Sequence, residues 1–250
     1  MARTLLFCFA HPDDESFSGA GTAMKYAAQA GVRSVLVTAT LGERGKMGDP
    51  AICTPEELPA CRGRELREAV RIIGIDALHL LGYRDRELAD APPADIRQAL
   101  VTVIRRERPS VVCTFDPNGF NVHPDHIAIS RFTSDALAAA ADPRWLPGAG
   151  APYTVPRLLW TPLHAPWEPV AADGTQPGAD FIIDIALWRE RKAAALRAHR
   201  SQHLSIDRCF FSQPDLDRIL SAETWRQAWG PALPRRPEAD IFEGLTTQSE

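Results

Sequence analysis

Apolar runs and segments of helical periodicity alternate along the first 140 residues of the chain. Apolar runs with the length of strands that are buried on both faces cover residues 4–9, 34–40, 77–81 and 110–115. Apolar positions recur at helical spacing over residues 16–30, 61–73, 93–108 and 124–141. This alternation predicts an α/β fold: a doubly wound, Rossmann-like, mostly parallel sheet flanked by helices.

The regular alternation of strand-like and helix-like segments ends after residue 141. Proline and glycine are frequent over 142–156, and the pattern then predicts strands over 157–160 and 181–185 and helices over 187–200 and 215–229. We expect one domain over residues 1–250. Its core, residues 1–141, carries the functional site, and residues 142–250 form a C-terminal extension that completes the domain.

Two of the predicted strands end in similar polar sequences. The first is followed by Ala10-His11-Pro12-Asp13-Asp14-Glu15, and the fourth leads into His123-Pro124-Asp125-His126. In the commonest doubly wound sheet the strand order is 3-2-1-4-5, so strands one and four are neighbours. The two polar sequences therefore meet at the carboxyl edge of the sheet, where such folds bind ligands.

Carboxylates and imidazoles gathered at one place favour a bound cation, because the carboxylates repel one another without it. The candidate ligands are His11, Asp13, Asp14, Glu15, His123, Asp125 and His126. A catalytic zinc ion takes three protein ligands and keeps one open position. A single aspartate before a helix is better explained as a helix cap, but two His-Pro-Asp sequences after two strands favour a metal site.

Composition restricts the classes of partner. The net charge of −4 and the presence of only three lysines, in no basic run, give no reason to expect nucleic-acid binding. No apolar stretch approaches the ~18 residues that span a bilayer, so we expect a cytoplasmic protein without membrane contact. The five cysteines show no C-x-x-C spacing, and we expect Cys53 and Cys61 to stay reduced. Association with a second copy of the chain is left open.

The two polar sequences resemble those of the LmbE-like, or PIG-L, family of zinc-dependent de-N-acetylases. Further similar motifs are Arg62-x-x-Glu65-Leu66, Tyr83-Arg84-Asp85 and Ala195-x-x-x-His199-x-Ser201-Gln202. Members of this family act on N-acetylglucosamine conjugates, among them the phosphatidylinositol glycolipid and precursors of mycothiol and bacillithiol. The resemblance covers nearly the whole chain.

The resemblance implies a role for each site residue. His11, Asp14 and His126 would bind one zinc ion per chain, and Fe²⁺ could take its place. Asp13 would be the general base, His123 the electrophilic or acid partner, Asp125 the group that orients His123, and Arg62 the group that holds the sugar. His199 and His203 are candidates for residues that support the site residues without binding the metal ion or the substrate themselves.

The implied reaction is removal of an N-acetyl group from a small-molecule sugar conjugate, for which N-acetylglucosaminyl malate is the example that we expect. Zinc suits amide hydrolysis because it lowers the pKa of bound water to about 7. Two alternatives stay open. Two histidines and one carboxylate also describe a non-haem iron(II) oxygenase, and a non-catalytic sugar-binding protein could use the metal as a structural clip.

Overall fold

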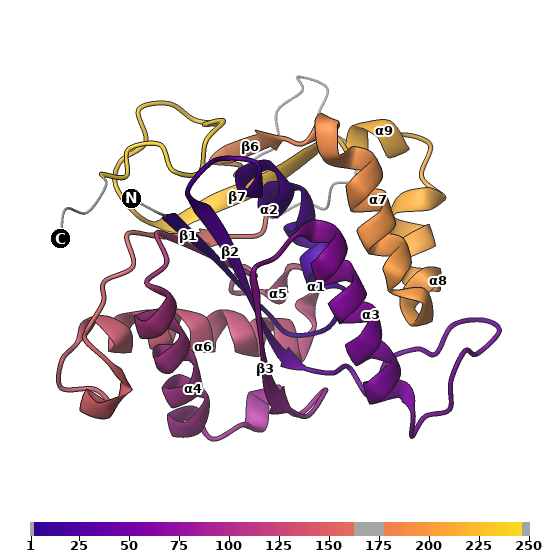
Figure 1. The fold of residues 1–250 in the computed structure, drawn as a ribbon, viewed down its shortest axis with the longest axis horizontal. Helices are drawn as coiled ribbons and strands as arrows, with labels where there is room; N and C mark the ends of the chain where they lie inside the picture. Colours follow the sequence, from indigo (N-terminus) through magenta and orange to yellow (C-terminus); the bar gives the residue numbers. More distant parts are fainter. Residues whose placement is uncertain (1–2, 163–177, 247–250) are drawn as a thin grey trace.

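In the computed structural model, which describes residues 3–162 and 178–246, seven strands form one sheet in the order β3-β2-β1-β4-β5-β7-β6 (Figure 1). The strands are β1 (Arg3–Phe9), β2 (Val32–Thr40), β3 (Ala77–Tyr83), β4 (Val111–Thr114), β5 (Arg157–Trp160), β6 (Phe181–Asp184) and β7 (Ala222–Trp229). The first five are parallel, whereas β7 runs antiparallel to both β5 and β6. The predicted fold class and the 3-2-1-4-5 order are confirmed.

Helices cover both faces of this sheet. They are α1 (Asp14–Ser18), α2 (Ala20–Ala27), α3 (Leu58–Ile73), α4 (Pro93–Glu107), α5 (Gly119–Val122), α6 (Pro124–Ala141), α7 (Arg189–Ala198), α8 (His203–Ile206) and α9 (Leu216–Ile219). Helices α4 and α6 pack together, and α3 packs with α7 near α2 on the other side (Figure 1). Within the described chain, no helix has the length and the apolar character needed to cross a bilayer.

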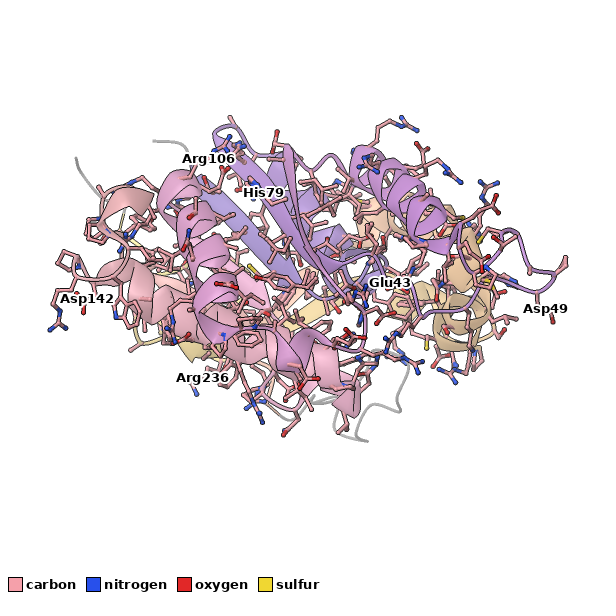
Figure 2. All side chains as sticks on the ribbon, turned by 90° about the horizontal axis from the view of Figure 1, so that it is seen from below. Glu43, Asp49, His79, Arg106, Asp142 and Arg236 are labelled. Atoms are coloured by element: carbon pink, nitrogen blue, oxygen red, sulfur yellow. The ribbon has the colours of Figure 1, made fainter. Side chains whose placement is uncertain are left out.

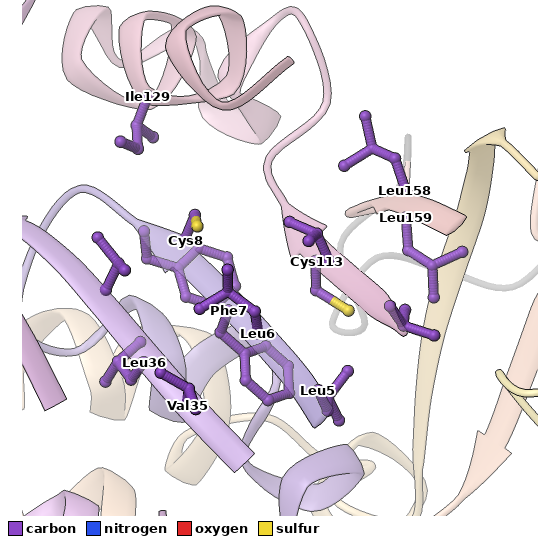
Figure 3. Packing of buried hydrophobic residues seen from close by; sticks show 14 of the residues in the cluster. Leu5, Leu6, Phe7, Cys8, Val35, Leu36, Cys113, Ile129, Leu158 and Leu159 are labelled. Carbon is purple, nitrogen blue, oxygen red and sulfur yellow. The ribbon is translucent and has the colours of Figure 1, made fainter. Parts of the chain in front are cut away.

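The central strand β1 is buried on both faces, as its apolar sequence predicts. Leu5, Leu6 and Phe7 are at most 1% exposed and lie between the neighbouring strands β2 and β4 (Figure 3). Burial raises the pKa of the Cys8 thiol to about 12. All five cysteines carry free thiols, as expected. The core thus fixes β1 and β4 side by side, and with them the two segments that follow.

Two predicted helices differ from the structure. The first, over 16–30, begins earlier and is divided at Gly19, where an added Cβ would lie 2.7 Å from the Phe7 ring. The second, over 215–229, is wrong: only Leu216–Ile219 is helical, and β7 follows.

The reason for β7 lies in tertiary contacts. The buried Trp225 packs beside Phe7, with ring centroids 6.3 Å apart. Glu223 forms a buried ion pair with Lys192 at 2.6 Å and accepts hydrogen bonds from the amides of Gly21 and Thr22. Burying alternate side chains requires an extended strand, and the partners of those side chains are distant in the sequence.

Candidate metal centre and active site

The metal-site residues come from the ends of neighbouring strands. Strands β1 and β4 pair in parallel, with Phe7 opposite Cys113. The chain after β1 carries His11 and enters α1 at Asp14, whereas the chain after β4 enters α6 and carries His126 in its first turn. Side chains more than a hundred residues apart in the sequence therefore reach one point at the carboxyl edge of the sheet.

Three of the predicted ligands gather their donor atoms within a small space. His11 Nδ1 lies 3.1 Å from His126 Nε2, which lies 3.3 Å from Asp14 Oδ1. The second carboxylate oxygen of Asp14 is 3.6 Å from His11 Nδ1. A tetrahedral ion with the usual zinc bond lengths separates its ligand atoms by about 3.4 Å. The spacing and the donor types therefore fit a metal ion such as zinc.

The charges around these atoms also favour a cation. Burial raises the pKa of Asp14, but the neighbouring His126 and His11 outweigh it and hold the pKa well below its usual range. Burial likewise disfavours protonated His11, yet Asp125, Asp14 and Asp85 raise its pKa well above the ordinary value. The carboxylates are thus stabilised by positive charge at this point, which a divalent ion would supply.

The opposite nitrogen of His11 faces two carboxylates. Asp125 Oδ2 and Asp85 Oδ1 each lie 3.1 Å from His11 Nε2. The Asp125 side chain is fully buried and accepts the backbone N–H groups of Arg86 at 2.6 Å and Leu88 at 3.2 Å. Such carboxylate contacts orient a ligating imidazole and select its tautomer.

This geometry differs from the arrangement expected for Asp125. Its carboxylate lies on His11, and only its backbone N–H contacts His123, donating to Nδ1 over 3.2 Å. Asp85 was not among the site residues predicted from sequence. The polar sequence Tyr83-Arg84-Asp85 at the end of β3 indicates a functional role for Asp85. Because β3 is not adjacent to β1 or β4, the predicted strand order alone does not bring Asp85 to His11.

Asp13 lies beside the metal-site residues in an unusual backbone conformation. Its φ of 109° falls in the region that L-residues rarely adopt. Its amide donates to Glu15 Oε2 at 3.1 Å, which helps to hold this conformation. Burial raises the pKa of Asp13 to about 6, although the guanidinium of Arg62 opposes the rise. The carboxylate is therefore both poised to accept a proton and open to the cavity, which it lines.

Arg62 is buried between two loops. One guanidinium nitrogen lies 3.3 Å from Asp13 Oδ1 and donates to the Pro12 carbonyl, and the other donates to the Gly42 carbonyl at 2.9 Å. Gly42 has a φ of 63°, and a Cβ there would lie 1.8 Å from the guanidinium. Arg62 lines the cavity, but its contacts in the structure are to Asp13 and to backbone carbonyls.

His123 lies at the rim of the site. Its ring stands edge-on to the His11 ring, with centroids 4.8 Å apart, and it lines the same cavity. Burial and the nearby imidazoles of His11 and His126 lower its pKa. Nitrogens of His11, His123 and His126 lie within 4.8 Å of one another, so His123 could also reach a metal ion.

Glu15 and His199 form a buried pair behind Asp13. His199 Nε2 lies 2.7 Å from Glu15 Oε1, and Ser16 Oγ donates to the same oxygen at 2.6 Å. Burial lowers the pKa of His199, but the charge of Glu15 raises it above the ordinary value. His203 lies elsewhere: it accepts from the Asp49 amide and contacts Asp207.

A cavity of about 800 Å³ opens above these groups. A volume of this size accommodates a sugar with an attached group. Its lining includes His11, Asp13, Asp14, His123 and His126, together with residues 44–46 of the loop between β2 and α3, residues 85–86 after β3 and residues 208–209 after α8.

Comparisons with known proteins identify the family of this chain. The profile of the PIG-L family, described as GlcNAc-PI de-N-acetylase, matches residues 6–137. The chain is 34% identical to a 1D-myo-inositol 2-acetamido-2-deoxy-alpha-D-glucopyranoside deacetylase of Streptomyces griseus subsp. griseus, over 98% of this chain and 89% of that protein.

A second relative matches a shorter region. A probable N-acetyl-alpha-D-glucosaminyl L-malate deacetylase of Bacillus anthracis is 42% identical over 54% of this chain and 60% of its own length. Among solved structures, the N,N'-diacetylchitobiose deacetylase of Pyrococcus horikoshii has the same fold, with a TM-score of 0.71, 23% identity, and coverage of 90% of this chain and 84% of that one. By its profile match and its full-length similarity, the chain belongs to the PIG-L family.

Proposed function

We propose that this protein is a metal-dependent hydrolase that removes the acetyl group from an N-acetylglucosamine conjugate. The observation that carries the proposal is the grouping of His11, Asp14 and His126 around one point, with the strained and partly exposed Asp13 beside them. Membership of the PIG-L family and the names of the relatives support the same reaction.

His11 Nδ1, His126 Nε2 and the Asp14 carboxylate would hold the ion, which we take to be zinc, with Fe²⁺ as a substitute. When bound, the ion supplies a nucleophile at neutral pH and Lewis-acid polarisation of the acetyl carbonyl. Asp125 and Asp85 contact His11 at Nε2, an arrangement that would keep the proton on Nε2 and leave Nδ1 available to the ion.

Asp13 acts as the general base. Its carboxylate is ionised at pH 7, because its pKa of about 6 lies below that pH, and it takes the proton that the attacking water loses. As the amide C–N bond breaks, Asp13 returns this proton to the nitrogen, which leaves as the free amine. Glu15 accepts the backbone N–H of Asp13 and is in turn paired with His199, so both residues help to hold Asp13 in position. Arg62 keeps positive charge beside the carboxylate and, from the cavity wall, is placed to contact the sugar.

His123 acts as a neutral hydrogen-bond donor to the oxyanion that forms at the acetyl carbonyl. Its Nδ1 accepts the Asp125 amide hydrogen, so the proton resides on Nε2, and its lowered pKa keeps the ring neutral near pH 7. This assignment differs from a protonated His123 held by the Asp125 carboxylate, because that carboxylate lies on His11.

The identity of the aglycone follows less directly. The relatives that match nearly the full chain are named as deacetylases of an inositol conjugate, whereas the malate-type relative covers about half of it. We therefore place the inositol conjugate ahead of N-acetylglucosaminyl malate. The iron oxygenase and the non-catalytic clip gain no support from the comparisons.

The test is release of primary amine from a panel of N-acetylglucosamine conjugates by zinc-loaded protein, iron-loaded protein and metal-stripped protein. We expect amine release that depends on the metal and that is nearly lost in Asp13→Asn. Absence of amine release from every conjugate by folded, zinc-loaded protein would refute the proposed reaction.

A further inference from the structure

Four basic side chains form most of the solvent-exposed part of the cavity lining. They are Arg44, Lys46, Arg86 and Arg208. The carboxylates that line the same cavity belong to the inner end, where they contact the histidines or Arg62. We call the four basic residues the basic rim. Within the described ranges, the exposed part of the cavity lining carries these basic side chains and no carboxylate.

Among the residues that the structure describes, most of the rim has no acidic partner. Arg44 forms an ion pair with Glu87. For Lys46, Arg86 and Arg208, no carboxylate of the described chain lies within ion-pair distance, and all three are exposed. Like charges around one concave surface raise its local potential and attract anions. The rim is also notable because the protein as a whole is acidic, with a net charge of −4.

The backbone of Arg86 is tied to the metal centre. Its φ of 65° is rare for a residue with a side chain, and its N–H donates to Asp125 Oδ2, the oxygen that lies 3.1 Å from His11 Nε2. Strained conformations of this kind persist where the surrounding contacts determine them. The backbone that carries the Arg86 side chain is therefore held in place relative to His11 and Asp125.

Arg208 approaches from a different part of the fold. It belongs to the helical turn Asp207–Phe211, directly after α8, which Figure 1 places away from β3, the strand that precedes Arg86. Arg86 and Arg208 thus come from separate elements and line the same cavity. Guanidinium groups bind carboxylate and phosphate through paired hydrogen bonds.

We propose that the basic rim recognises an anionic group, a carboxylate or a phosphate, on the aglycone of the N-acetylglucosamine conjugate, with Arg86 and Arg208 as its specificity-determining residues. This inference rests on the proposed function. With the acetyl group at the metal end, the aglycone of a conjugate extends toward the mouth. The favoured substrates are then acidic conjugates. For the inositol aglycone that the names of the full-length relatives favour, this means an inositol that carries a phosphate and not free inositol, and malate offers the same charge through its carboxylates.

The experiment compares kcat/KM of the zinc-loaded enzyme for three N-acetylglucosaminides: those of neutral inositol, inositol phosphate and malate. We expect the anionic substrates to exceed the neutral one by about tenfold or more, as charge-assisted hydrogen bonds allow. The preference should shrink as NaCl rises, because the screening length falls from about 10 Å at 0.1 M to about 3 Å at 1 M. Comparison of kcat/KM between the inositol phosphate conjugate and the malate conjugate shows whether the rim prefers phosphate or carboxylate.

Arg86→Gln and Arg208→Gln should each reduce the ratio of anionic to neutral kcat/KM. Arg106→Gln is the matched control: Arg106 lies near the end of α4, at the amino edge of the sheet, and Figure 2 shows it away from Glu43, the neighbour of rim residue Arg44. Equal kcat/KM for neutral and anionic conjugates would overturn the inference while leaving the deacetylase intact. A preference unchanged in both rim variants would also overturn it. Hydrolysis of none of the three would refute the proposed reaction itself.

Discussion

Replacing Asp125 with asparagine tests whether its carboxylate orients His11 for metal binding. The substitution keeps the size of the side chain and removes its charge. Asp125 is fully buried, and it lies 3.1 Å from His11 Nε2 while accepting the amides of Arg86 and Leu88. Asparagine retains one acceptor oxygen, so it cannot serve the imidazole and both amides as the carboxylate does.

The size of the effect follows from these contacts. Loss of a carboxylate that orients a ligating histidine lowers metal affinity by about 10–100-fold, which corresponds to roughly 1.4–2.7 kcal/mol of binding free energy. Asp85 lies at the same 3.1 Å from the same nitrogen and can compensate in part, so we expect the lower end of this range for a single change. An amide left without an acceptor lowers the free energy of unfolding by about 1–3 kcal/mol.

The assay is competition for zinc between the protein and a chromophoric chelator. It compares wild type, Asp125→Asn, Asp85→Asn and the double variant. We expect the double variant to lose more affinity than the two single losses combined, because each carboxylate compensates for the other. Asp135→Asn is the control: it is the same change on the same helix, at a partly exposed carboxylate that pairs with Arg97 at 2.6 Å.

Unchanged zinc affinity, within about twofold, in both single variants and in the double variant would refute the reasoning. The free energy of unfolding of the metal-free proteins, measured with urea, separates a loss of affinity from a loss of folding. Asp85→Asn keeps the test valid even if Asp125→Asn proves too unstable to assay.

Four further predictions concern the proposed chemistry. Asp13→Asn should retain zinc by elemental analysis and lower kcat by roughly 10²–10⁴-fold; near-normal turnover would remove Asp13 from the role of base. In the proposed reaction the ionised form of Asp13 is the active one. The kcat/KM of wild type should therefore fall as pH decreases, with a midpoint at or below about 6 because a bound cation favours the carboxylate; no fall in kcat/KM down to pH 4 would contradict this. The positive charge of His199 lowers the pKa of Asp13, and His199→Gln should therefore move that midpoint to higher pH, whereas a purely structural role would change only the amplitude. His123→Ala should keep zinc and lower kcat by about 10²–10³-fold; a variant without zinc would instead identify His123 as a ligand.

Much of the fold can be read from local sequence. The apolar run of β1 and the helical periodicity around it predict a parallel sheet, because a strand covered on both faces has no polar positions. The chirality of crossovers then makes β1 and β4 neighbours. This is why the two His-Pro-Asp sequences can be assigned to one site before any coordinates are considered.

Other features depend on contacts that no local pattern contains. Strand β7 resembles a helix in sequence and is a strand because Trp225 and Glu223 find buried partners in β1, α2 and α7. Asp85 joins the metal centre from β3, which is separated from β4 by two strands. The Asp125 carboxylate points to His11 and not to His123, because the strained turn at Arg86 offers it an amide on that side.

The sequence is therefore sufficient to predict the layers of the fold, the order of its first five strands and the residue types that gather at the carboxyl edge. These depend on periodicity, strand length and crossover handedness, which are local or nearly local properties. The tertiary structure alone shows which carboxylate faces which imidazole, and it brings Arg86 and Arg208 to one mouth. Such pairings depend on side-chain direction and loop conformation, and these are set by packing between segments far apart in the chain.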